Sequence, residues 1–315
     1  MKNIGIIGIG GVGGYFGGKM CTVLKNSSEY NLYFIARGEH LQQILKNGLV
    51  LKTSNEGERV CKPTLATDKF EDLPVLDICF ICVKQYDLNN VLLKLKDKIT
   101  TKTKIIALLN GVDIYNRIRK IIDKGIVFPA CVYVGTHIEA PGVVSQNGGH
   151  CTIIFGKDPH NKEVPADDIC SIFDESAIKY NWAQNHISEI WSKYMFIASY
   201  GLVTACYNKT LGEVYADEKY SSIVKDIMKI IYNLSKAENV NINKKIIQAS
   251  YDKADNFPFE TKTSFQRDFE NNNRPDEREL FGQSIIELGR KHSINVDIVE
   301  NLYEQINKIK TNITL

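Results

Sequence analysis

Apolar and polar positions alternate along the first half of this 315-residue chain as short apolar runs separated by amphipathic segments. This pattern is typical of strands that are each followed by a crossover helix. Turn residues beside short apolar runs in segments 140–149 and 151–156 then predict an antiparallel hairpin that closes the first domain. The buried strands of a largely parallel sheet are expected at Ile4 to Ile7, Leu32 to Ile35, Leu76 to Val83, Lys104 to Leu109 and Ile126 to Val134.

The second half shows no strand pattern from about Ile187 onward. The stretch from Lys253 to Glu279 is dense in charge and lacks clean periodicity, so we expect it to form solvated loop and helix surface. The sequence predicts an α/β fold class, with a parallel-sheet domain over residues 1–180 and an all-helical domain over residues 181–315. Apolar residues fall on one helical face at Ile223, Ile227, Ile230, Ile231 and Leu234, and again at Val299, Leu302, Ile306 and Ile309.

Composition and charge narrow the class of protein. Hydrophobic residues make up 43% and charged residues 24% of the chain, and the net charge of +2 offers no excess for a nucleic-acid surface. The eight cysteines lack disulfide-framework spacing, no signal peptide is recognised, and no apolar run reaches the roughly 20 residues of a membrane span. We therefore expect a cytoplasmic protein whose partners are small molecules rather than nucleic acid or membrane. A homodimer is left open.

A glycine-rich turn follows the first apolar run. Gly8, Gly10 and Gly13 stand in G-x-G-x-x-G register, with Gly11 and Val12 between them, just before a helix-compatible segment. In a dinucleotide site such glycines allow a tight turn, the approach of a pyrophosphate, and close packing of helix on strand. The phosphates would lie at the helix N-terminus, where N–H groups and the helix dipole favour negative charge. The pattern predicts a Rossmann-type domain with these five residues at the cofactor.

The end of the second apolar run indicates which dinucleotide is bound. An NAD site usually has Asp or Glu there to bind the ribose 2'-hydroxyl, whereas this run ends in Ala36-Arg37-Gly38. A guanidinium suits a 2'-phosphate, so Arg37 predicts NADPH. The alternative is that Arg37 is an ordinary surface arginine.

Two more polar residues follow predicted strands, at the edge where ligands bind in open α/β sheets. Lys84 follows the third apolar run and Asn110 the fourth. Their shared location favours a place in the site for both. The alternatives are a solvated charge for Lys84 and a turn residue before glycine for Asn110.

One lysine stands within the largely apolar helical segment 190–200. Hydride reduction of a carbonyl leaves negative charge on oxygen, so the enzyme needs a proton donor or a cation at that atom. Lysines are seldom buried without a partner, because desolvating the ammonium ion is costly. Lys193 is therefore the candidate general acid, and the alternative is a lysine that extends to the helix surface.

The motifs taken together, in their order along nearly the whole chain, resemble the ketopantoate reductase (2-dehydropantoate 2-reductase) family. The resemblance implies a Rossmann domain, a helical domain and an active site in the cleft between them. It also implies NADPH-dependent reduction of ketopantoate to pantoate, a step of pantothenate and coenzyme A biosynthesis. Besides the glycine turn, it rests on Ala36-Arg37-Gly38, Val83-Lys84, Leu109-Asn110-Gly111, Pro141-Gly142, Trp191-x-Lys193, the run Thr263-Ser264-Phe265-Gln266-Arg267-Asp268, then Arg274-Pro275-Asp276-Glu277, and Gly282.

The resemblance also implies roles for individual residues. Lys193 would protonate the developing alkoxide, while Glu277 would contact the substrate hydroxyl or the lysine. Asn110 would lie near both nicotinamide and substrate, Lys84 near the cofactor, and Ser264 on the substrate carboxylate. Without the resemblance, Ser264 would be taken as a helix N-cap and Glu277 as a solvated charge.

The chain departs from the family pattern where substrate is recognised. Ile197, Gly201 and Thr261 stand where the family commonly has Asn. One extra residue after Asp268 makes Asp276 an alternative to Glu277. Losing amide donors should weaken polar recognition of a substrate. Reduction of a different, less polar 2-oxo acid therefore remains an alternative, as do another two-domain dehydrogenase and a catalytically silent NADPH sensor.

The spacing of cysteine and histidine residues bears on whether the chain holds a metal or redox site. Cys79 and Cys82 match C-x-x-C spacing, but residues three apart on a strand point to opposite faces, so we expect core cysteines. The six histidines include no pair at metal-ligand spacing. No metal is predicted.

Overall fold

The computed structural model describes residues 1–24, 27–271 and 275–314 of the chain. Contacts divide the chain into two compact units: Met1–Asn110 with Ile114–His186, and Gly111–Asp113 with Ile187–Leu315. The division after His186 lies beyond residue 180, because strand β13 (Lys179–Trp182) pairs with β12 (Thr152–Phe155) inside the first unit.

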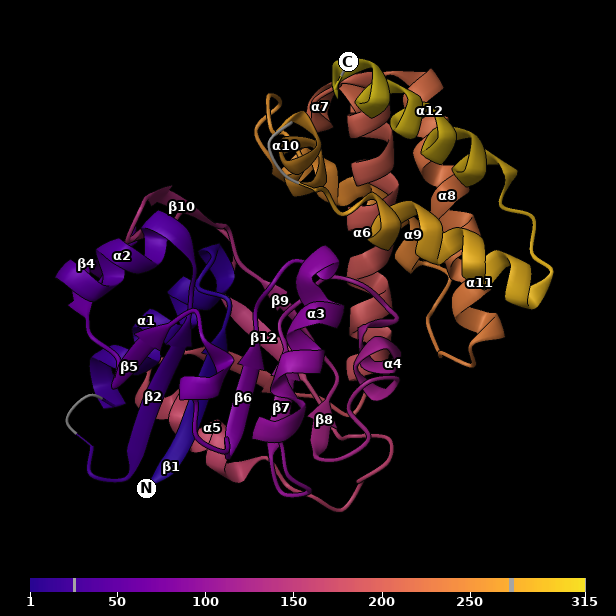
Figure 1. The fold of residues 1–315 in the computed structure, drawn as a ribbon. Helices are drawn as coiled ribbons and strands as arrows, with labels where there is room; N and C mark the ends of the chain where they lie inside the picture. Colours follow the sequence, from indigo (N-terminus) through magenta and orange to yellow (C-terminus); the bar gives the residue numbers. More distant parts are fainter. Residues whose placement is uncertain (25–26, 272–274, 315) are drawn as a thin grey trace. The chain divides into compact units, whose positions relative to one another are not determined.

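The first unit is built on a parallel sheet in the order β5-β2-β1-β6-β7-β8 (Figure 1). Every neighbouring pair in it is parallel, which confirms the predicted Rossmann-type sheet. Parallel strands are buried on both faces and therefore read as continuous apolar runs, which is why the sequence revealed them. The strands are β1 (Lys2–Ile7), β2 (Tyr30–Ile35), β5 (Leu65–Thr67), β6 (Ile78–Ile81), β7 (Lys104–Ala107) and β8 (Ile126–Phe128).

Helices cover both faces of this sheet. α1 and α5 contact each other on one face, and α3 and α4 contact each other on the other (Figure 1). Two short 3-10 segments, Phe70–Asp72 and Lys96–Lys98, lie in the connections that the structure describes. The helices of the unit are α1 (Gly11–Leu24), α2 (Gly38–Asn47), α3 (Gln85–Leu95), α4 (Ile114–Arg119, grouped with this unit) and α5 (Asp167–Glu175).

The apolar run from Ile126 to Val134 is two strands, so the prediction of a single strand there is wrong. β8 ends at Phe128, and β9 (Ala130–Tyr133) begins after Pro129 and pairs antiparallel with β12. Proline has no N–H to give to a sheet ladder, and it restricts the residue before it. The chain therefore leaves the main sheet at Pro129.

An antiparallel hairpin is present, but its strands differ from those predicted. β10 (Thr136–Ala140) pairs with β11 (Val143–Gln146), and segment 151–156 instead holds β12, which belongs with β9 and β13. β11 also pairs with β3 (Leu49–Thr53), which pairs with β4 (Gly57–Cys61). This second sheet packs against α1.

The second unit is helical, as the sequence predicted. α8 buries Ile227, Ile231 and Leu234, whereas Ile223 and Ile230 are only half-buried. Its described elements are most of α6 (His186–Tyr207), α7 (Leu211–Ala216), α8 (Glu218–Ala237), α9 (Ile246–Asp252), a 3-10 segment (Lys253–Asn256), α10 (Ser264–Glu270), a π-helical turn (Glu279–Gln283), α11 (Ser284–His292) and α12 (Asp297–Thr314).

The charge-dense stretch from Lys253 to Glu279 is more buried than we expected. α10 places Phe265 and Phe269 in the interior, with rings 6.3 Å apart, and Asp276 is buried as well. The expectation of solvated surface is wrong there, because the short amphipathic helix is masked in sequence by its charged neighbours. None of the helices formed by the described residues combines the length and the apolar character that a membrane span requires.

Candidate functional site

The glycine turn leaves the carboxyl end of β1, in the middle of the main sheet. Gly8 has φ +97°, a conformation that other residues rarely adopt, and a Cβ there would lie 2.7 Å from Val83 Cγ1. A Cβ on Gly13 would lie only 2.0 Å from the Gly8 carbonyl oxygen. These two glycines let the first turn of α1 press directly against the end of the strand.

Gly10 differs, because a Cβ there would meet no atom within 4 Å. The side of Gly10 is therefore open space beside the N-terminus of α1, where first-turn N–H groups have no acceptor within the helix. Gly11 is closed off instead, since its Cβ would lie 2.8 Å from the Thr136 carbonyl oxygen. Val12 is half-buried and packs on the core. An open cradle at a positive helix end fits the pyrophosphate of a dinucleotide.

Three further predicted residues follow strands β2, β6 and β7 of the same sheet. Arg37 precedes α2, Lys84 precedes α3, and Asn110 follows β7. Because these strands are parallel, their carboxyl ends meet at one edge, together with the glycine turn. Lys84 and Asn110 are half-buried, so neither is a fully solvated group.

Arg37 makes an ion pair that the sequence alone does not indicate. Its Nη2 lies 2.9 Å from Asp87 Oδ2, although the Arg37 side chain is 77% exposed. Asp87 lies in the first turn of α3, three residues after Lys84, and this position was the only signal in the sequence. Arg37 is thus exposed at the site edge and has a specific partner.

In the second unit, Lys193 is buried with 9% exposure on α6. Its neighbours Trp191, Tyr194 and Met195 are buried too. The alternative in which the lysine extends to the helix surface is therefore wrong. α6 is apolar on most of its circumference, which makes a buried ammonium group within it a functional candidate.

The segment that carries Glu277 packs against α6 beside the lysine. Tyr194 donates a hydrogen bond of 2.6 Å to the Leu280 carbonyl, and the Phe281 N–H donates to the Glu277 carbonyl. Glu277 is 3% exposed, so the alternative of a solvated charge is wrong.

Asp276, the rival for the family's Glu position, is held by an ion pair. Its carboxylate accepts hydrogen bonds from Arg278 Nη2 at 2.6 Å and Nε at 2.8 Å, and Lys310 Nζ lies 4.0 Å away. This bidentate pair commits Asp276 to Arg278. Arg274 of the same motif lies outside the described residues.

Ser264 is the first residue of α10 and is exposed. The N-cap is Thr263, whose side chain accepts a hydrogen bond from the Gln266 N–H, so the N-cap alternative for Ser264 is wrong. The Ser264 hydroxyl does not have that capping role.

The three positions that depart from the family pattern differ in their surroundings. Ile197 is half-buried one helical turn after Lys193. A Cβ on Gly201 would be 3.5 Å from Phe265 Cβ, so the Phe265 ring covers this side of α6. Thr261 is half-buried, and its carbonyl accepts a hydrogen bond from the Leu211 N–H. The side chain at position 197 is thus aliphatic, and the neighbour of Gly201 is an aromatic side chain.

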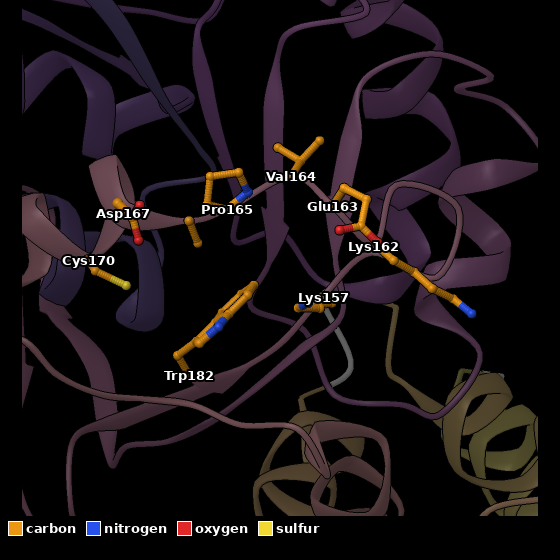
Figure 2. A pocket seen from close by; sticks show the side chains of 9 residues that line it. Lys157, Lys162, Glu163, Val164, Pro165, Asp167, Cys170 and Trp182 are labelled. Atoms are coloured by element: carbon orange, nitrogen blue, oxygen red, sulfur yellow. The ribbon is translucent and has the colours of Figure 1, made fainter.

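A surface pocket of about 130 Å³ lies elsewhere and is not the nucleotide site (Figure 2). Asp167 and Cys170 of α5 line it, together with Trp182. The next residue of α5, Asp168, pairs with Lys2 and Lys104, which begin β1 and β7. The pocket is therefore near the amino ends of the strands, opposite the glycine turn.

The cysteines in C-x-x-C spacing lie in the first unit. Cys79 on β6 is buried and Cys82 follows that strand, and burial raises the pKa of both thiols. Both are free cysteines. Within residues 1–24, 27–271 and 275–314, no group of three or more His, Cys, Asp or Glu side chains could hold a metal ion.

Comparisons with known proteins identify the family of the chain. The N-terminal and C-terminal profiles of the family described as ketopantoate reductase PanE/ApbA match residues 4–160 and 185–310. An uncharacterized oxidoreductase YkpB of Bacillus subtilis is 23% identical over 96% of both chains. A 2-dehydropantoate 2-reductase of Streptococcus pyogenes is 24% identical over 85% of this chain and 86% of its own.

Solved structures share the fold across the whole chain. A PanE/ApbA family ketopantoate reductase from Ralstonia eutropha matches with a TM-score of 0.88 at 22% identity, covering 100% of both chains. A D-mandelate dehydrogenase, solved with NADH and anilino(oxo)acetate, matches with a TM-score of 0.84 at 19% identity, also covering 100% of both. With profiles that together span most of its length, the chain belongs to the ketopantoate reductase family of NAD(P)-dependent oxidoreductases.

Proposed function

We propose that this chain catalyses the NADPH-dependent reduction of 2-dehydropantoate (ketopantoate) to pantoate. The observation that carries the proposal is the burial of Lys193 on the apolar helix α6. Burying an ammonium group costs free energy, so a lysine buried on a largely apolar helix is a candidate for a functional role. A proton donor is what hydride reduction of a carbonyl requires.

Each candidate residue has a role in this reaction. NADPH, when bound, supplies the hydride that reaches the C2 carbonyl carbon. Lys193 donates a proton to the carbonyl oxygen as its charge develops, and Glu277 holds the ammonium group charged or contacts the substrate hydroxyl. The exposed Ser264 hydroxyl donates to the substrate carboxylate. Asn110 orients the reacting groups at the sheet edge.

The first unit holds the cofactor. The pyrophosphate binds at the open side of Gly10, against the N–H groups that begin α1. Lys84 adds positive charge at the same edge of the sheet. Arg37 contacts the 2'-phosphate, which favours NADPH over NADH, because a guanidinium forms strong charge-assisted hydrogen bonds with phosphate.

The test is the oxidation of NADPH by purified protein with ketopantoate, followed by absorbance and by identification of pantoate. We expect ketopantoate-dependent turnover that is faster with NADPH than with NADH. Absence of turnover with every 2-oxo acid tried would reject a reductase and leave the nucleotide-sensing alternative.

A less polar 2-oxo acid is a second candidate substrate. Ile197 and the Phe265 ring beside Gly201 favour it, because neither offers a hydrogen bond to a substrate hydroxyl. The discriminating pair is ketopantoate and 3,3-dimethyl-2-oxobutanoate, which lacks only the hydroxyl. A higher kcat/KM for the analogue would show that a less polar 2-oxo acid is the better substrate. A higher kcat/KM for ketopantoate would exclude the less polar 2-oxo acid.

A further inference from the structure

The ion pair between Arg37 and Asp87 crosses the carboxyl end of β1. Arg37 follows β2 and Asp87 follows β6, and the strand order places β1 between them. The guanidinium approaches the carboxylate through both of its Nη atoms, with Nη2–Oδ2 at 2.9 Å and Nη1–Oδ1 at 3.5 Å. The pair thus spans the strand that leads into the glycine turn.

The ion pair between Arg37 and Asp87 lies at the surface, where its two opposite charges are partly exposed to solvent. The Arg37 side chain is 77% exposed and that of Asp87 is 28% exposed. Ion pairs this exposed contribute little to stability, so little free energy opposes the replacement of one partner by another. A phosphate dianion is a stronger partner for a guanidinium than one carboxylate. A phosphate group brought to Arg37 would therefore compete with Asp87 for the guanidinium.

We propose that Asp87 is a specificity-determining residue that lowers the preference of this chain for NADPH over NADH. The inference rests on the proposed use of NADPH. A 2'-phosphate either displaces the Asp87 carboxylate from Arg37 or binds beside it against like-charge repulsion. A 2'-hydroxyl carries no charge and meets neither cost. Asp87 thus weakens the binding of one nucleotide selectively.

The test compares the nucleotide affinities of the wild type and of Asp87→Asn, which keeps the shape of the side chain and removes its charge. Dissociation constants for NADPH and NADH are measured by nucleotide fluorescence, without substrate. We expect NADPH to bind two- to five-fold more tightly to the variant, or about 0.4–1 kcal/mol. NADH should bind with unchanged affinity.

Two further variants make the result specific. Asp226→Asn is the matched control, because Asp226 also forms an exposed pair, with Lys229 at 2.9 Å on α8 in the other unit. It should change neither constant. In the background of Arg37→Gln, Asp87→Asn should lose most of its effect on NADPH, because its consequence depends on the guanidinium. Equal melting temperatures show that the variants are folded.

Three outcomes would overturn the inference. Weaker NADPH binding by Asp87→Asn would mean that the carboxylate orients Arg37 for the phosphate. Weaker NADH binding with unchanged NADPH binding would mean that Asp87 binds the ribose hydroxyl. An unchanged ratio would mean that the ion pair has no effect on specificity. In each of these cases the proposed function still holds if the wild type binds and oxidises NADPH. If the wild type binds neither nucleotide, both the proposed function and the role of Asp87 are rejected.

Discussion

The carbonyl oxygen of Gly8 occupies the space that a side chain on Gly13 would need, since a Cβ there would be 2.0 Å away. Gly10, two residues after Gly8, faces open space instead. The two motif glycines Gly10 and Gly13 are therefore required for different reasons. Gly13 is required by the packing of α1 on β1, and we propose that Gly10 is required to leave room for the pyrophosphate of a nucleotide.

Alanine at these positions should separate folding from binding. Gly10→Ala should keep the wild-type melting temperature but weaken nucleotide binding by about tenfold or more, because the methyl group enters the pyrophosphate cradle. Gly13→Ala should lower the melting temperature, because the added methyl group would force the backbone at Gly8 to move. Thermal unfolding and nucleotide fluorescence measure both effects, and wild-type nucleotide affinity in Gly10→Ala would contradict this account of the cradle.

Lys193→Ala should reduce kcat by about 10²- to 10⁴-fold, the usual contribution of a positioned general acid. The NADPH dissociation constant should stay within about twofold, because we place the lysine at the substrate. Steady-state kinetics and fluorescence titration give the two values. Lys229→Ala, on the exposed side of α8, is the control. Equal turnover in Lys193→Ala and the wild type would remove Lys193 from the mechanism.

Glu277 and Asp276 should respond differently to loss of their charges. Asp276→Asn leaves Arg278 without its carboxylate partner and should destabilise the fold by about 3 kcal/mol. Glu277→Gln should change kcat or KM by tenfold or more with a smaller effect on stability. Chemical denaturation and kinetics of both variants test the assignment, and the reverse pattern would give the family's Glu position to Asp276.

Asp158 should make the first unit sensitive to acid. Burial alone raises the pKa of Asp158, but hydrogen bonds from Tyr115, Asn161 and two backbone N–H groups outweigh burial and hold the pKa below its ordinary value of 3.8. Arg119 Nη2 also lies 2.5 Å from this fully buried carboxylate.

A carboxyl group whose pKa is lowered by folding stabilises the protein above its unfolded pKa and loses that effect as the pH falls through the folded pKa. The contribution of Asp158 should therefore be complete above about pH 5, decline as the pH falls below the unfolded pKa, and be lost once the pH has passed through the lowered pKa of the folded protein. Asp158→Asn should lower stability at neutral pH by about 3 kcal/mol and flatten the acid limb of the stability profile. Denaturation at a series of pH values measures both effects. An unchanged acid limb would mean that other carboxyl groups cause the loss of stability at low pH.

Much of the fold was determined by local sequence. The apolar runs that became β1, β2, β6 and β7 are buried on both faces, and the 3.6-residue periodicity of α8 and α12 reports one buried stripe each. The glycine register and Arg37 at the end of β2 likewise depend only on neighbouring residues. Such features can be identified because burial and turn geometry impose short repeats on the chain.

The tertiary structure decided what depends on distant partners. Sequence could not reveal that Arg37 pairs with Asp87, fifty residues away, or that Glu277 and Asp276 are both buried in the fold. The sequence also could not show that β9, which follows Pro129, pairs with β12 and not with the main sheet, because that pairing joins residues far apart in the chain. Ion pairs and strand partners are set by which surfaces meet after folding, and no local periodicity records them.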